Sequence, residues 1–83
     1  MLRLEEMPVT VLAPHIVADP SIRSGRPVIE GSRVPVEVVV GQMGAGLTVE
    51  QVASEYGITR EDVLAALAYA AQVLSMEQVR AVG

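Results

Sequence analysis

Two helix signals separated only by Gly57 and Ile58 constrain the fold of this chain more than any other feature. The first covers residues 48–56, where Thr48 and Gln51 have the spacing of a capping box. The second covers residues 59–74, where Thr59 is followed by acidic residues that the helix dipole favours in a first turn. Gly57 lies between them and can adopt the left-handed conformation that ends a helix. The sequence therefore predicts two consecutive helices joined by a tight turn.

The side chains around this turn have the types and spacing of a helix-turn-helix motif. Ala53 is small enough for two helices to cross closely, and Gly57 supplies the turn four residues later. Ile58 can fill the turn from the core side, and Val63 faces the first helix from the second. An ordinary helical hairpin that never touches DNA has the same pattern. The spacing therefore predicts a shape and leaves the ligand open.

The remaining segments complete a single expected domain, residues 1–83, that is mainly α with a small N-terminal β element. Short strands are expected at residues 8–13 and 16–18. Residues 35–43 have two interpretations, because their valines favour a strand while their apolar positions recur with helical spacing, and we favour the helix. With Phe and Trp absent, Val, Ala and Leu must fill a core that is marginal in 83 residues, which favours a homodimer.

Several classes of function are disfavoured by what the chain lacks. It contains no Cys and a single His, His15, so neither a disulfide nor a zinc site within one chain is expected. No Ser has the His and acid that would activate it, so we expect no enzyme, no metal site and no cofactor. The uncharged run from Val63 to Met76 is shorter than the roughly 20 apolar residues that span a bilayer. Acidic residues near the N-terminus do not fit a secretory signal, so a cytoplasmic protein is expected.

In a helix-turn-helix, the start of the second helix enters the major groove of DNA. Here that start offers Thr59 for a phosphate and Arg60 for a guanine. Glu61 and Asp62 follow at once, and the formal net charge of −4 also opposes binding to a polyanion. The shape of the motif is therefore better supported than its usual ligand.

The outer face of the predicted second helix continues with Leu64 and Ala65, which suit contact with a protein better than contact with DNA. Arg60 consequently has two interpretations, a DNA contact or a solvated charge paired with a nearby acid. The same choice applies to the whole chain. It is either a DNA-binding regulator or a module that dimerises and binds a protein partner without DNA.

Three arginines form a second group of candidate binding residues in the only net-basic stretch, residues 15–35. Arg23, Arg26 and Arg33 all lie in turn-rich sequence between short apolar segments. Together they could bind phosphates or the carboxylates of a partner. Alternatively they are three separate surface charges, with Arg26 and Arg33 having structural roles because each adjoins an apolar segment.

Two segments resemble one known family. Residues 24–40, SGRPVIEGSRVPVEVVV, resemble the Gly-x-Pro-Val-Ile-x-Gly-Thr-Arg-x-Pro-Val signature of a widespread prokaryotic domain family of uncharacterised function. Ser32 stands where the signature has Thr and keeps the hydroxyl. The run from Gly46, GLTVEQVASEYGITREDVLAALAYAA, resembles the Gly-x-Ser/Thr-x-Glu-x-Ile/Val and Ala-Leu-x-Tyr-Ala segments of the same family.

The resemblance implies a homeodomain-like or winged-helix fold with a small N-terminal β element, in a protein that is often dimeric. Many members of this family are paired with a PIN-domain ribonuclease and are regarded as antitoxins of type II toxin–antitoxin modules. The resemblance therefore implies an antitoxin that binds such a toxin and also binds its own promoter DNA. PIN nucleases hold Mg²⁺ between carboxylates, so Arg80 on the C-terminal tail is a candidate to reach that acidic site.

Overall fold

A small sheet and three helices build the structure, a computed structural model that describes residues 3 and 6–82, with side chains described at residue 3 and at residues 6–76. Strands β1 (Thr10–Ala13), β2 (Ile16–Ala18) and β3 (Pro27–Ile29) form an antiparallel sheet in the order β1-β2-β3. Helices α1 (Val36–Gly44), α2 (Val49–Tyr56) and α3 (Arg60–Val82) follow. The expectation of a mainly α fold with a small N-terminal β element is confirmed.

The first two strands form a tight hairpin. Pro14 and His15 connect them, and His15 has a φ of 69°, which is the left-handed region that a type II turn requires after its proline. A bulge interrupts the pairing between Val11 and Ala13, so the strand is curved at that point. Strand β1 lies at one edge of the sheet, while β2 is paired on both sides.

The third strand was not predicted, because it begins with a proline and has turn-forming residues on both sides. A compact loop connects β3 to α1 and explains the residues of the signature. Gly31 has a φ of 79°, and the Ser32 hydroxyl donates to the Ile29 carbonyl at 2.9 Å while it accepts from the Val34 amide at 3.1 Å. Pro35 then forms an isolated bridge with β3 and precedes the first residue of α1.

The turn between α2 and α3 follows the local chemistry of the sequence. Thr48 and Gln51 form both hydrogen bonds of the predicted capping box at the start of α2. Gly57 ends α2 with a φ of 66°, and the Ile58 amide donates to the Ala53 carbonyl at 3.0 Å. A side chain at Gly57 would meet nothing within 4 Å, so its left-handed conformation is the reason for glycine there.

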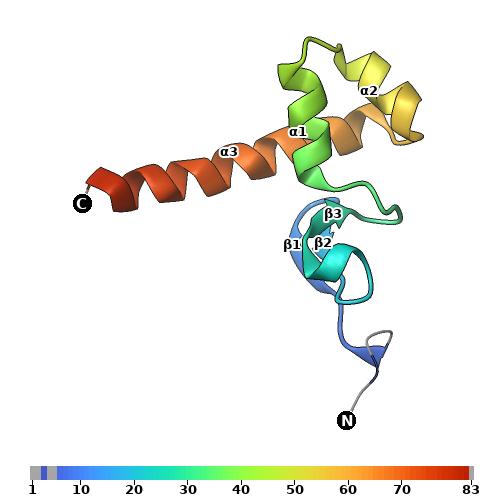
Figure 1. Ribbon diagram of the computed structural model, residues 1–83, viewed down its shortest axis with the longest axis vertical. Helices are drawn as coiled ribbons and strands as arrows, with labels where there is room; N and C mark the ends of the chain where they lie inside the picture. Colours follow the sequence, from blue (N-terminus) through green and yellow to red (C-terminus); the bar gives the residue numbers. More distant parts are fainter. Residues whose placement is uncertain (1–2, 4–5, 83) are drawn as a thin grey trace.

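The core lies where the sheet, α1 and the first half of α3 meet (Figure 1). Isoleucine, valine and alanine side chains fill it, as expected for a chain without Phe and Trp, namely Ile16, Ile29, Val36, Val39, Val52, Val63 and Ala66. Ala53 and Ile58 pack against this cluster from the α2–α3 turn. All three helices and the sheet therefore share one core.

The buried face of α3 differs from the expected one. Ala66 is fully buried and Ala65 is half-buried against the core, although Ala65 was expected on the outer face. The apolar spacing of this helix in the sequence predicts that Ala71 and Leu74 lie on its buried side with Val63, but Ala71 is exposed and Leu74 is 56% exposed. The helix continues to Val82, and its second half projects from the body (Figure 1). No other element of the described chain covers Leu74, which explains its exposure.

Candidate functional site

The first turn of α3 carries the residues predicted to contact DNA, and most of their polar groups bond within the turn. The Thr59 hydroxyl accepts from the Asp62 amide at 3.0 Å, and the Asp62 carboxylate accepts from the Thr59 amide at 3.0 Å. These two bonds close the start of the helix as a capping box does. Thr59 and Asp62 therefore have a structural role at the start of α3, although in these bonds the Thr59 hydroxyl only accepts and can still donate to a phosphate.

Arg60 is bound to an acid of the neighbouring helix. Its Nη1 lies 2.5 Å from Oε2 of Glu50, which is in the first turn of α2. Both side chains are largely exposed, so the ion pair is weak and a stronger anionic ligand could displace Glu50. In the structure Arg60 is thus a charge paired with a nearby acid, which was one of its two interpretations.

His15 connects the sheet to the start of α3, a contact that the sequence did not predict. Its Nδ1 lies 2.9 Å from Oδ1 of Asp62, 47 positions away in the chain. Burial by itself would raise the pKa of the Asp62 carboxyl, but hydrogen bonds from Thr59 and His15 outweigh that effect and lower the pKa below 3.8. Asp62 is therefore the carboxylate that fixes the hairpin to the helix.

The three arginines of the N-terminal half do not form one cluster. Arg23 and Arg26 line the same shallow cavity beside α1, and Nη1 of Arg26 lies 2.6 Å from Oε1 of Glu37. Arg33 lines a different cavity. Within the part of the chain that the structure describes, the guanidinium groups of Arg23 and Arg33 form no hydrogen bond or ion pair. Two exposed arginines therefore remain available, one at each cavity.

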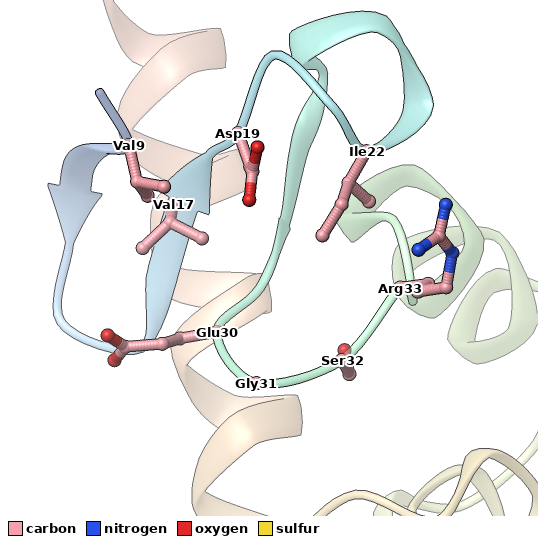
Figure 2. A pocket seen from close by; sticks show the side chains of 8 residues that line it. All are labelled: Val9, Val17, Asp19, Ile22, Glu30, Gly31, Ser32 and Arg33. Atoms are coloured by element: carbon pink, nitrogen blue, oxygen red, sulfur yellow. The ribbon is translucent and has the colours of Figure 1, made fainter. Parts of the chain in front are cut away.

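Figure 2 shows the cavity of Arg33, an open pocket of about 480 Å³ between the sheet and the loops on either side of β3. Val9, Val17 and Ile22 give it an apolar floor. Asp19 lies between Val17 and Ile22, and Arg33 lies beside Ile22 (Figure 2). Hydrogen bonds from the Ser21 hydroxyl and amide lower the pKa of Asp19, with a smaller effect from Arg33. With Glu30 also at its edge, the pocket combines charges of both signs with apolar side chains.

A longer apolar groove runs between α1 and α3. It has a volume of about 660 Å³ and is lined by Val36, Val40 and Gly41 from α1 and by Tyr69, Ala70, Val73 and Leu74 from α3. The Arg26–Glu37 ion pair and Pro27 form one end of it. The sequence did not predict this groove, although the apolar spacing on both helices was visible. It has the chemistry to accept an apolar segment of a partner, with a charged pair at its rim.

Other candidate sites can be stated briefly. The side chain of Arg80 lies outside the described residues. Among the residues that were described, no three His, Cys, Asp or Glu side chains are grouped as a metal site would require. No helix in that part of the chain has the length and apolar character needed to cross a membrane. The groove, the two cavities and the first turn of α3 are therefore the surfaces to explain.

Comparison with known proteins gives consistent matches. The model of a family described as "Protein of unknown function (DUF433)" matches residues 16–70, which extend from β2 into the first half of α3. A protein of Mycobacterium tuberculosis (strain ATCC 25618 / H37Rv) named "Putative antitoxin VapB45" is 42% identical over 53 residues. These matches confirm the resemblance to an uncharacterised prokaryotic family.

One solved structure has the same arrangement. The crystal structure of Rv2018 from Mycobacterium tuberculosis superposes with a TM-score of 0.59 at 42% sequence identity and covers 63% of this chain. The sequence match to VapB45 covers 64% of this chain and 22% of VapB45. The structural match covers 24% of the Rv2018 chain. This chain therefore spans only about a quarter of the length of these relatives, and the similarity concerns one part of each.

Proposed function

The chain belongs to the DUF433 family, and from that premise we propose that it is the antitoxin of a type II toxin–antitoxin module. In this role it is a small dimeric protein without enzymatic activity that binds a PIN-type ribonuclease in the cytoplasm. The observation that carries the proposal is its 42% identity over 53 residues with a protein named as an antitoxin. The family segment, residues 16–70, supplies the body on which the binding surfaces lie.

The groove between α1 and α3 is the surface that we propose for the toxin. Val73 and Leu74 give it an apolar wall that no described element covers, and Leu74 is 56% exposed. An amphipathic helix of a partner can lay its apolar face in such a groove. The Arg26–Glu37 pair at the rim then orients the partner through its charges. Arg80 extends this proposal, since a cation on the tail is suited to the acidic metal site of the nuclease.

The proposal is tested by co-expression with a PIN-domain nuclease encoded beside this chain. We expect the two proteins to co-purify and growth to be restored. Leu74→Asp places a charge in the groove and should lower nuclease binding at least about tenfold, or 1.4 kcal/mol. Met76→Asp is the matched control, because Met76 is on the same helix, is 61% exposed and does not line the groove. Equal binding by both variants would refute the groove, and absence of binding by the wild type would refute the antitoxin. If the Arg80→Ala variant inhibits the nuclease as well as the wild type does, Arg80 has no role in toxin binding.

Binding of the chain's own promoter is a second candidate function, favoured by the α2–α3 turn. Ala53, Gly57, Ile58 and Val63 occupy the positions that a helix-turn-helix needs, and Arg60 begins the second helix. The Arg60–Glu50 ion pair and the net charge of −4 oppose it. Of the two candidates, the protein partner is therefore better supported by the charges.

The ion pair suggests a sharp test of DNA binding. If Arg60 contacts DNA, Glu50→Gln releases it and should strengthen binding to the upstream DNA, whereas Arg60→Ala should abolish the specific shift. Arg23→Ala is a control for general attraction to phosphate, because Arg23 is an exposed arginine on a different surface. If the chain binds no DNA at low salt but still binds the nuclease, promoter binding is refuted and the chain is a module that binds a protein partner without DNA.

A further inference from the structure

The free edge of β1 carries an unusual amount of exposed apolar surface. Four of the seven large apolar side chains that are exposed in the described chain lie within residues 7–12, namely Met7, Val9, Val11 and Leu12. Val11 is the most exposed of them at 69%. Such side chains beside unpaired main-chain groups are typical of a strand that pairs with another strand.

This edge has few of the features that keep sheet edges apart. No charged residue occurs between Glu6 and His15, and β1 pairs only with β2 among the described strands. The bulge at Leu12 curves the strand and is a common protective feature, but lysines and inward-pointing charges are absent. The edge is therefore able to accept a further strand.

We propose that a second copy of this chain occupies the edge, with β1 pairing antiparallel to β1 of its partner about a twofold axis at Val11. Val11 lies midway between Pro8 and Pro14, so this register places each Pro8 opposite the Pro14 of the other copy. Prolines lack the amide that a ladder requires, and this register confines them to its two ends. A partner with an unrelated sequence would not share this symmetry.

Charge also fits a second copy. Each copy carries a formal net charge of −4, so most surfaces of two copies repel each other. The stretch from residue 7 to residue 14 is uncharged and is the part of the sheet edge where two copies can meet without like charges opposed. Added salt should therefore strengthen the dimer, because it screens the repulsion outside the interface.

This inference rests on the proposed function for the existence of a dimer, but it specifies which surface forms it and is tested without the toxin. Sedimentation of the purified chain should show a concentration-dependent dimer. Val11→Lys should weaken it at least about tenfold, because two lysines would meet at the axis. Met76→Lys is the matched control, because Met76 is on α3, is 61% exposed and lies outside the strand edge, and it should have no effect. A monomer at all concentrations, or a dimer that Val11→Lys leaves unchanged, overturns the proposal.

The absence of cysteine from the natural sequence allows the register to be tested by cross-linking. Opposed residues of an antiparallel pair have Cα atoms about 4.5–5.5 Å apart, which suits a disulfide. Val11→Cys should therefore cross-link to itself, and an equal mixture of Thr10→Cys and Leu12→Cys should give the heterodimer. Thr10→Cys alone should cross-link slowly. Preferred cross-linking of Thr10→Cys with Val11→Cys would overturn the proposed register.

Nuclease binding is measured in parallel, so that the two proposals can fail separately. A dimer that Val11→Lys disrupts, in a chain that binds no nuclease, refutes the antitoxin and supports the strand pairing. A chain that is monomeric alone but loses its nuclease on Val11→Lys refutes the strand pairing and places the toxin at this edge.

Discussion

Asp62 should stabilise the fold through its charge, and replacing it with Asn isolates that contribution. Asn is the same size and can still accept the hydrogen bond from the Thr59 amide at 3.0 Å. What it loses is the charge beside the N-terminus of α3 and the charged hydrogen bond to His15 at 2.9 Å. The perturbation is therefore electrostatic and leaves the packing intact.

The expected loss can be worked from these two contacts. A carboxylate in the first turn of a helix contributes about 0.3–1 kcal/mol through the helix dipole. The charged hydrogen bond exceeds a neutral one by about 1 kcal/mol, which we halve because the His15 side chain is 48% exposed. Asp62→Asn should therefore lower the free energy of unfolding by about 0.8–1.5 kcal/mol at neutral pH, or lower Tm by about 3–12 °C.

The pH dependence provides the decisive measurement. The pKa of Asp62 is lowered in the folded chain, so its contribution is fully present above the unfolded value near 3.8 and is lost as pH falls through the lower folded value. Urea unfolding followed by circular dichroism should show that the wild type and Asp62→Asn differ at pH 7 and converge as the pH falls through the lowered folded pKa of Asp62.

Glu61→Gln serves as the control for this prediction. Glu61 lies in the same first turn of α3, but its carboxylate is exposed and has no hydrogen bond or ion pair among the described residues, so only the small dipole effect should be lost. An equal loss in both variants, or a difference between the wild type and Asp62→Asn that stays constant with pH, would refute the assigned role of Asp62.

Three further substitutions test the local chemistry by urea unfolding. Ser32→Ala removes both hydrogen bonds of the loop before α1 and should cost about 1–2 kcal/mol, whereas Ser32→Thr should keep them; equal losses would contradict the role of the hydroxyl. Gly57→Ala should cost about 1–2 kcal/mol because of its positive φ alone, and Gly57→Asn should cost less. Val52→Ala opens the core at a fully buried position and should cost about 1.5–3 kcal/mol; a neutral result would show that the core can collapse around it.

Local patterns predicted the helical half of this fold well. The capping box of Thr48 and Gln51 and the left-handed Gly57 depend on residues within one turn of each other, and both are present in the structure. The β3 strand escaped prediction because it begins with a proline and lies between two turns. The projecting end of α3 reverses the expected burial of Leu74, since burial depends on what lies over a helix as well as on its own apolar spacing.

The candidate sites were harder to predict because they join residues far apart in the chain. Glu50 lies 10 positions from Arg60 and Glu37 lies 11 from Arg26, and nothing in the local sequence selects these partners among the available acids. The groove likewise needs two helices to be docked before it exists. Sequence spacing identified Arg60 and Arg26 as candidates, but only the packing of the helices shows which carboxylates compete for them.

The bond between His15 and Asp62 also has a consequence for the order in which the chain assembles. The three helices meet through a chain that is continuous from residue 36 onward, whereas the hairpin must close a separation of 47 residues to reach the same helix. Closing a longer loop costs more chain entropy, and contacts distant in sequence slow folding. The helices should therefore form a docking platform first, and the hairpin should join last and detach first. Amide exchange would then be fastest in β1 and β2, and the strand edge would be complete only in the last step of folding.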